Sequence, residues 1–435
     1  MGKTAPRTWV SERSISKARN VPSSGQGRGF AAMAAAYFLG VFNDNYYKQA
    51  VLVLAVTAGR TLLQGLVVLV FTLPFLVFAA PAGWVADRFP KRQVVIAAKG
   101  VEVAAMALGA AGLATGQWWL IFGMLGLMGT QATFFSPALN GALPELFSAD
   151  RVLRANGVLR MGVTLAILAG IALAGLTLDL KGSGLLGLEA GRLGIAYGVM
   201  AVALVGLVVS FGVPQRPAAD PRAPFPWTGP WVTLRDLWAI RRDPLLAVAV
   251  AGGVFIWFAG SLQVLLINPM GLQQLGVSKS LTSALIIAQL LGIGVGGLLS
   301  ARWAQGPGWH RVLAPSAAGM GLVMLAVAAV PQLAPAAQLP AAFGLMALVG
   351  IFGGLFLIPV ESFIQTRPDP GHRGAVLAAV NFIEFAGILV SGPVSNILNG
   401  HWRPTSSFGL VGVLSLVLSL VMVFLCRWIN SGGRR

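Results

Sequence analysis

Charged residues are scarce in this chain, acidic ones above all, and so are the side chains that build most catalytic and metal sites. Of 435 residues, 14 are acidic, three are histidine and one is cysteine. The lone Cys426 excludes a disulfide within the chain, and no cysteine and histidine residues have metal-ligand spacing. The sequence therefore predicts neither a disulfide-linked domain nor a metal site, and it predicts no cofactor.

Apolar residues are abundant instead. Hydrophobic residues make up 56% of the chain and its mean hydropathy is +0.77, far above the range of soluble proteins. Twelve apolar runs are long enough to cross a hydrocarbon core of roughly 30 Å. They cover residues 30–58, 62–86, 93–115, 118–142, 153–178, 192–213, 244–270, 281–302, 311–330, 339–365, 374–398 and 406–428. The sequence predicts an all-α integral membrane protein with twelve transmembrane helices.

The cations indicate how these helices cross the membrane. With the N-terminus inside, 24 Lys and Arg residues fall on the cytoplasmic side and five on the outer side. Such an excess is typical of cytoplasmic loops, and it predicts that both termini are cytoplasmic. A net charge of +17 would suggest a nucleic-acid partner for a soluble protein. Here the cations lie in loops and termini, so no nucleic acid is expected.

The two halves of the chain are related in sequence. Three residues of the first half recur 222 positions later in the second, at the end of the fourth run of each half and in the loop that follows. They are Phe134, Pro137 and Arg151, which recur as Phe356, Pro359 and Arg373. Matches at equivalent positions favour two duplicated six-helix bundles, as in many transporters.

The longest break between apolar runs, residues 214–243, divides the twelve runs six and six. The predicted organisation is a cytoplasmic tail (1–29), an N-terminal bundle (30–213), a cytoplasmic linker (214–243), a C-terminal bundle (244–428) and a second tail (429–435). The linker combines tryptophans with arginines, so either a short helix in the membrane interface or a plain connecting loop is compatible with it.

Several polar residues lie within the predicted spans, where each costs a few kcal/mol if it faces lipid. Two readings stay open: static ion pairs that fix the register of the helices, or a polar cavity between the halves that binds a ligand headgroup or a coupling ion. Spacings of three or four place Asp44 with Lys48, and Lys99 with Glu102, on shared helix faces. The candidate binding residues are Asp44, Asn45, Lys48, Lys99, Glu102, Glu361, Asn381 and Glu384.

A cationic loop joins the second and third runs. Residues 83–92 read Gly-Trp-Val-Ala-Asp-Arg-Phe-Pro-Lys-Arg, which resembles the signature loop between helices 2 and 3 of the major facilitator superfamily. The resemblance implies an alternating-access transporter in which this loop latches the cytoplasmic gate. The gating residues that it implies are Gly83, Asp87, Arg88, Lys91 and Arg92.

A closer resemblance begins in the first run. Residues 42–48 read Phe-Asn-Asp-Asn-Tyr-Tyr-Lys, similar to the opening motif of the bacterial lysophospholipid transporter family, and residues 99–102 and 135–138 continue the match. The resemblance implies a carrier, not an enzyme, that moves lysophospholipids such as lysophosphatidylethanolamine to the cytoplasmic leaflet of the inner membrane for reacylation. In that case Asp44 is expected to hold the ammonium, and Lys48 or Lys99 to attract the phosphate.

The same resemblance bears on partners. Some members of that family are fused to an acyltransferase and an acyl carrier protein synthetase, so these enzymes are expected here as separate proteins. The carrier itself is expected to be a monomer surrounded by membrane lipids. A general exporter of hydrophobic or cationic compounds, and a membrane scaffold without transport, are the rival functions.

The chain departs from the family pattern at four positions. Leu139 replaces a lysine, Arg160 replaces an acid, and Glu361 and Glu384 stand where amides are expected. One expectation is a rewired ion-pair network in which Arg160 pairs with one of the two glutamates. A changed headgroup preference is the other.

Overall fold

The computed structural model describes residues 23–146, 149–183, 188–304, 306–369 and 372–432. Its long elements are helices. The first half contains α1 (Ser23–Thr57), α2 (Leu63–Val77), α3 (Ala79–Arg88), α4 (Lys91–Thr115), α5 (Trp118–Leu146), α6 (Ala149–Leu178) and α7 (Ala190–Ser210). After α8 (Gly229–Ile240), the second half contains α9 (Pro244–Pro269), α10 (Lys279–Trp303), α11 (Leu313–Ala329), α12 (Pro335–Thr366), α13 (Arg373–His401) and α14 (Pro404–Gly432).

Most of the predicted spans correspond to helices that are apolar enough to cross a membrane. Ten helices of the described chain satisfy this on length and hydropathy, and α2 with α3 forms an eleventh span bent by 54°. Pro81 explains this bend, because its ring clashes with the carbonyl of Val77, where α2 ends. Helix α1 occupies the first predicted span, but its polar segment lowers its hydropathy, so a count of twelve spans and the positions of the termini remain predictions.

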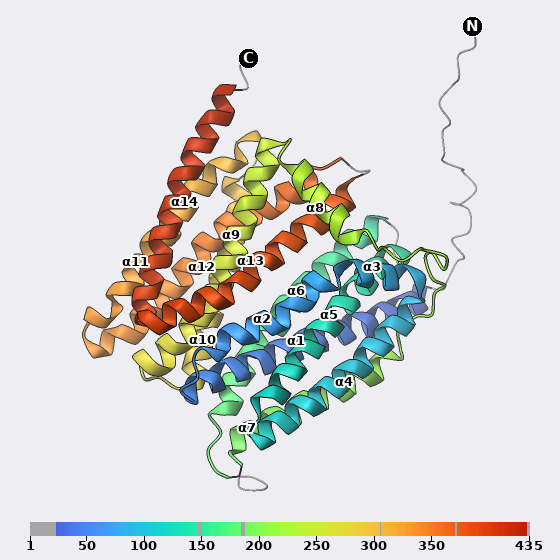
Figure 1. Cartoon of the computed structure of the whole chain (residues 1–435), viewed down its shortest axis with the longest axis horizontal. Helices are drawn as coiled ribbons and strands as arrows, with labels where there is room; N and C mark the ends of the chain where they lie inside the picture. Colours follow the sequence, from blue (N-terminus) through green and yellow to red (C-terminus); the bar gives the residue numbers. More distant parts are fainter. Residues whose placement is uncertain (1–22, 147–148, 184–187, 305, 370–371, 433–435) are drawn as a thin grey trace.

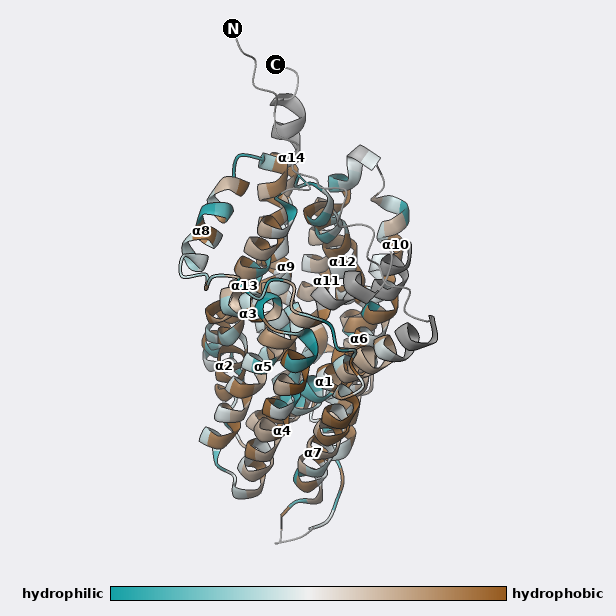
Figure 2. Cartoon of the chain, turned by 90° about the vertical axis from the view of Figure 1, so that its right-hand side faces the viewer, coloured by the Kyte–Doolittle hydropathy of each residue, from teal (hydrophilic) through white to brown (hydrophobic). Residues whose placement is uncertain are grey.

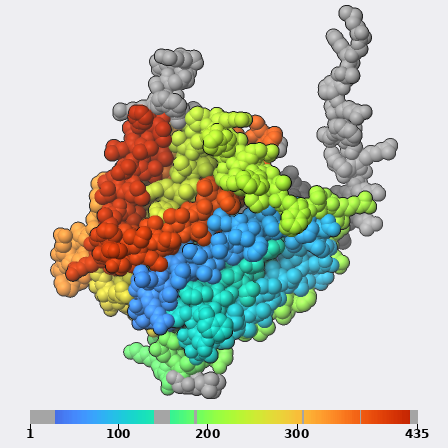
Figure 3. Space-filling view, viewed as in Figure 1, coloured from blue at the N-terminus to red at the C-terminus, as the bar shows by residue number. Residues whose placement is uncertain are grey.

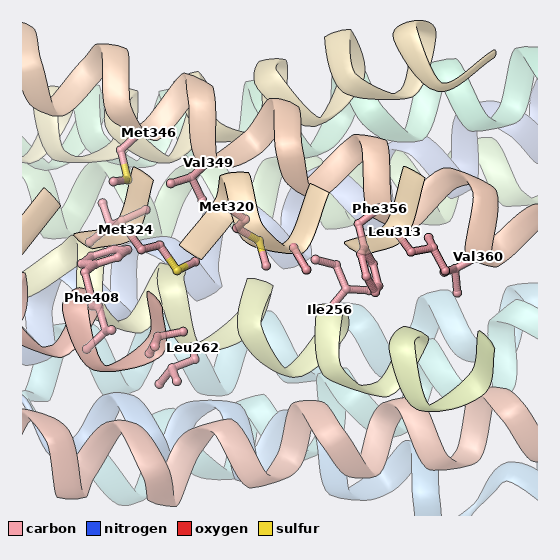
Figure 4. Close-up of a cluster of buried hydrophobic side chains, with 14 of the residues drawn as sticks. Ile256, Leu262, Leu313, Met320, Met324, Met346, Val349, Phe356, Val360 and Phe408 are labelled. Atoms are coloured by element: carbon pink, nitrogen blue, oxygen red, sulfur yellow. The ribbon is translucent and has the colours of Figure 1, made fainter. Parts of the chain in front are cut away.

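The helices form two bundles. Helices α1–α7 pack with one another, as do α9–α14, and α8 lies between the two groups in the chain (Figure 1). Hydrophobic residues cover most of the length of the long helices (Figure 2). The C-terminal bundle is built around a cluster that includes Ile256, Met320, Met324, Phe356 and Phe408, contributed by four of its helices (Figure 4).

Glycines let the helices approach each other closely. In the C-terminal bundle, a Cβ on Gly350 would lie 2.0 Å from the carbonyl oxygen of Gln289 on α10. Between the bundles, a Cβ on Gly65 of α2 would lie 2.5 Å from the carbonyl oxygen of Gly392 on α13, and the reverse contact is equally short. Small residues at such crossings are typical of membrane helix packing.

The contacts between the bundles lie toward one end of the molecule. Helix α2 lies beside α13, and α6 lies beside α10 (Figure 1). These helices approach most closely at the end of the molecule where α1 ends and α14 begins. Near this end the amide of Gln49 on α1 donates to Asn268 on α9 at 3.0 Å and to Ser283 on α10 at 3.2 Å. If the predicted orientation holds, the bundles are joined at the outer side, which is an inward-facing arrangement.

Candidate functional site

A charged cavity of about 270 Å³ lies mainly within the N-terminal bundle. Asp44 of α1 and Lys99 of α4 both line it, with Tyr37 and Gln131 among the other polar side chains of its wall. Aromatic rings enclose these charges, and the Lys99 ammonium lies 5.5 Å from the centroid of the Phe135 ring. The structure therefore brings together two of the sequence-predicted charges of opposite sign.

Lys99 is neutralised inside the bundle. Its Nζ lies 2.6 Å from Oε2 of Glu102, one helical turn later, and both side chains are buried. Asn43 donates to the other carboxylate oxygen at 3.3 Å, so both oxygens of Glu102 have partners. Gly40 leaves room for the ammonium, because a Cβ there would lie 2.8 Å from it. This pair fits the static ion-pair reading of the sequence.

Asp44 is different. Its Oδ1 is buried and accepts no hydrogen bond from the described residues. A buried carboxylate is costly unless a cation or several donors surround it. Because Glu102 already engages Lys99, Asp44 is the acidic acceptor lining this cavity that remains available to a cationic group of a ligand.

A larger cavity of about 380 Å³ lies between the two bundles. Asn45, Lys48 and Gln49 of α1 form part of its wall, but most of its lining comes from apolar residues of both bundles, such as Ile171 and Ile256. The Lys48 ammonium lies 4.9 Å from the centroid of the Phe71 ring, close enough for a cation–π interaction.

The two cavities adjoin. Phe71 of α2 and Phe385 of α13 line both of them. Phe385 also stacks on Phe75, with ring centroids 4.5 Å apart, and this stack joins the two bundles. A charged compartment with Asp44 thus opens next to an apolar compartment with Lys48 at the border, an arrangement that suits a molecule with a polar head and an apolar tail.

The candidate residues of the C-terminal bundle lie apart from these cavities. Glu361 lines neither cavity, but it accepts a hydrogen bond of 3.0 Å from Trp257, which lines the larger one. Glu384 is buried, 6% exposed, and lines neither. Asn381, three residues before Glu384, is exposed and lines neither cavity.

The predicted pairing of Arg160 is absent from this conformation. Arg160 is exposed on α6, and no ion pair within the described chain joins it to Glu361 or Glu384. The physical reason is the placement of the groups, because Arg160 belongs to the N-terminal bundle and both glutamates to the other. Glu361 interacts with the Trp257 indole instead.

Sequence reasoning missed several residues of the cavities. Tyr37 and Gln131 line the charged cavity, and Oε1 of Gln131 is buried and accepts no hydrogen bond from the described residues. Gln263 and Gln289 bond to each other in the wall of the larger cavity. The sequence signal for these glutamines was an uncharged amide within an apolar run. Such an amide more often forms a hydrogen bond between helices than it binds a ligand.

The gating loop contacts the linker. Arg88 donates from Nη1 at 2.8 Å, and Trp84 from Nε1 at 2.9 Å, to the carbonyl oxygen of Ala223. The backbone carbonyl of Asp87 accepts from Asp220 at 2.9 Å, while its carboxylate side is exposed. The other three predicted gating residues have different surroundings. Lys91 is buried, Arg92 donates to the Phe211 carbonyl at the end of α7, and Gly83 faces open space.

Part of the linker forms a helix, α8. Of the two expectations for this segment, a short helix or a plain connecting loop, the helix is the one observed. It packs on α13, and a Cβ on Gly229 at its start would lie 2.5 Å from Cβ of Ala80 on α3. The linker therefore lies across the boundary between the two bundles (Figure 3). Trp231 and Trp238 are 74% and 62% exposed, as expected for a helix that rests in the membrane interface.

At the opposite end, two helices cap each other across the bundles. The carboxylate of Asp179, just after α6, accepts from the backbone N–H groups of Lys279 at 3.2 Å and Ser280 at 2.8 Å, in the first turn of α10. The Lys279 ammonium in turn donates to the carbonyl oxygen of Leu178 at 2.8 Å. Unpaired groups at helix ends need such partners.

Comparisons with known proteins place this architecture in a class. Residues 27–333 and 250–434 match the family model described as the Major Facilitator Superfamily. Among solved structures, a bacterial homologue of the human lysosomal transporter Spinster, inward-facing and unoccupied, superimposes with a TM-score of 0.72 at 15% identity, covering 93% of this chain and 97% of that one. A POT family transporter in complex with 5-aminolevulinic acid gives 0.72 at 12% identity, with 91% and 96% covered. The fold is that of a multi-pass membrane transporter of this superfamily.

Sequence relatives narrow the class. The lysophospholipid transporter LplT of Enterobacter sp. (strain 638) is 30% identical over 352 residues, which cover 78% of this chain and 81% of the relative. The LplT protein of Yersinia enterocolitica serotype O:8 is 29% identical over 384 residues, with 83% and 85% covered. The chain belongs to the lysophospholipid transporter family of the Major Facilitator Superfamily.

Proposed function

We propose that this protein moves lysophospholipids, such as lysophosphatidylethanolamine, between the leaflets of the bacterial inner membrane by alternating access. The observation that carries the proposal is the junction of a charged cavity and an apolar cavity at Phe71 and Phe385. A lysophospholipid has one acyl chain and a polar head, so it needs both compartments at once.

The head would enter the charged cavity. Asp44 offers a carboxylate oxygen without a partner among the described residues, which suits the ammonium of an ethanolamine. Lys48, whose ammonium lies at Phe71 on the border of the two cavities, suits the phosphate. Lys99 already bonds to Glu102, so its main role would be to hold that carboxylate and not to bind phosphate.

The acyl chain would lie in the apolar cavity between the bundles. Removing apolar surface from water is worth about 25 cal/mol per Å², so this lining would keep the chain out of water without any directional contact, at little cost relative to the leaflet that it leaves. The transported lipid would then be reacylated on the cytoplasmic side by a separate acyltransferase with its acyl carrier protein synthetase.

The test is leaflet-specific transport by the purified protein in liposomes. Labelled lysophosphatidylethanolamine is added to the outer leaflet, and the fraction that albumin can still extract is followed over time, with empty liposomes as the baseline. We expect protein-dependent loss of extractable lysolipid, and no such loss for a two-chain phosphatidylethanolamine. Transport of a hydrophobic cation without transport of any lysolipid would instead support the general exporter.

A further inference from the structure

We infer that Glu384, together with Glu361, forms a proton-binding site in the C-terminal bundle that is separate from both cavities and biases the equilibrium between the inward- and outward-facing states. A test of this inference by lysolipid transport rests on the proposed function, whereas a test that measures the two conformations directly does not. The inference starts from the burial of Glu384, which is 6% exposed and whose buried Oε1 has no hydrogen-bond partner among the described residues.

Among the described side chains of the helices that pack against α13, none is a cation free to face this carboxyl group. Helix α13 packs against α9, α2, α8, α14 and α12. Helices α9 and α2 contain no charged residue, and the charges of α8 are Arg235 and Asp236, which pair with each other at 3.4 Å. The sequence of α14 contains one cation, Arg427, whose side chain is not among those that the structure describes. On α13 itself, Arg373 is the first residue of the helix, eleven residues before Glu384.

The charged neighbour on α12 has the same sign. The sequence of α12 contains one charged residue, Glu361, and it is an acid like Glu384. Two carboxylates without a cation between them cannot both stay charged in an apolar setting at low cost, so at least one carries a proton. Metal binding is a poor alternative, because hard cations take about six or more oxygens and the described residues contain no cluster of three acidic, histidine or cysteine side chains.

The packing around Glu384 fits a carboxylic acid. A Cβ on Gly253 of α9 would lie 2.6 Å from Oε1, so this glycine leaves the space that the carboxyl group occupies. The same hypothetical Cβ would lie 3.6 Å from Cδ1 of Ile364, an apolar neighbour. A neutral acid is compatible with such a pocket, whereas its anion is not.

A route for the proton runs from the end of the molecule that is predicted to be cytoplasmic. Glu361 lies five residues before the end of α12, roughly 8 Å along the helix, and it is partly exposed. Glu384 lies eleven residues into α13, roughly 16 Å deep from the same side. Glu361 therefore lies nearer to that end of the molecule than Glu384, and its Trp257 partner connects it to the wall of the larger cavity.

The proton is linked to the conformation through Phe385. This residue follows Glu384, lines both cavities and stacks on Phe75 of the other bundle. Loss of the proton would place an uncompensated charge beside this contact. The inward-facing conformation, in which the carboxyl group has no cation, is then destabilised as the pH rises.

The experiment measures the two conformations directly. Spin labels are attached to cysteines at Arg60 and Gln332, exposed outer loop positions of the two bundles, in a Cys426→Ser background. The ratio of short to long distances is recorded from pH 6 to pH 8.5 at constant sodium. Wild type should lose the short distance as pH rises, by up to about tenfold per pH unit above the pKa of the site. Glu384→Gln and Glu384→Met should keep it throughout.

Controls separate this site from other carboxylates. Glu189→Gln, which changes an exposed carboxylate in an outer loop, should retain the wild-type response. A pH response that persists in both Glu384 variants, or a response to sodium in place of pH, would overturn the inference. So would a wild type that does not respond at all. If lysolipid flux is absent from wild-type liposomes while the distance ratio still follows pH through Glu384, the proposed substrate is wrong and the proton site stands.

Discussion

Replacing Asp179 by alanine should loosen the contact between the two bundles at the end of the molecule that is predicted to face outward. The carboxylate accepts hydrogen bonds from two backbone N–H groups at the start of α10. The hydroxyl of Ser278, the residue before α10, accepts from a third, the N–H of Leu281. The two N–H groups would lose their acceptor in Asp179→Ala. Because α6 and α10 belong to different bundles, this loss acts on the balance of conformations and not on either bundle alone.

The expected size follows from helix capping. Removing a capping acceptor costs about 0.5–2 kcal/mol, and the charge of a half-exposed carboxylate is partly screened. We take about 1 kcal/mol, which corresponds to a shift of about fivefold in a two-state ratio. The ratio of outward-facing to inward-facing molecules should rise by that factor.

The pH dependence has a definite sign. Burial acts to raise the pKa of Asp179, but the hydrogen bonds from Ser280 and Lys279 together outweigh it, so the pKa lies below the ordinary value. A carboxyl group with a lowered pKa in the closed form stabilises that form above its ordinary pKa, and this contribution is lost as the pH falls through the lowered value. The contribution of Asp179 is therefore constant across the neutral range.

The assay uses the spin-label pair in the outer loops at pH 7. We expect the ratio of long to short distances to rise about fivefold in Asp179→Ala. Glu189→Gln is the matched control, because Glu189 ends the same loop but pairs with Arg192 of its own bundle. An unchanged ratio in Asp179→Ala, or an equal change in the control, would refute the reasoning.

Two further predictions concern the interior. Lys99→Met leaves the buried Glu102 without its cation, at a cost on the order of 3–5 kcal/mol, so thermal unfolding of the purified variant should begin at a clearly lower temperature. Adding Glu102→Gln should restore much of the loss, and a wild-type transition in the single variant would contradict the pairing. Gly392→Val places methyl groups against the Gly65 carbonyl and should lengthen the outer label distance, whereas Gly400→Val, on the open face of α13, should not.

The sequence predicted the helices because long apolar runs have few alternatives in a membrane. It also predicted the Lys99–Glu102 pair, since a spacing of three places both side chains on one side of a single helix. Asp44 was identified for a related reason, as a charge in an apolar run needs a partner or a cavity. In each case the information is contained within one helix.

Contacts between distant helices were not predictable in this way. Asp44 and Lys48 share a spacing of four, yet they line different cavities, since Asp44 faces into the N-terminal bundle and Lys48 faces the space between the bundles. The bond from Trp257 to Glu361 joins residues 104 positions apart, and no local pattern reports it. The capping of α10 by Asp179 likewise depends on how the helices pack.

The central claim is that Asp44 holds the cationic part of a lysolipid head, and Asp44→Asn tests it most directly because this change keeps the volume and removes the charge. The measurement is the initial rate at which labelled lysophosphatidylethanolamine leaves the albumin-extractable leaflet of liposomes, compared at equal amounts of folded protein with wild type and with Glu189→Gln. We expect a loss of at least about tenfold for Asp44→Asn, corresponding to about 1.4 kcal/mol of lost binding, with the control at the wild-type rate. Transport by Asp44→Asn at the wild-type rate would contradict the claim and place the head elsewhere.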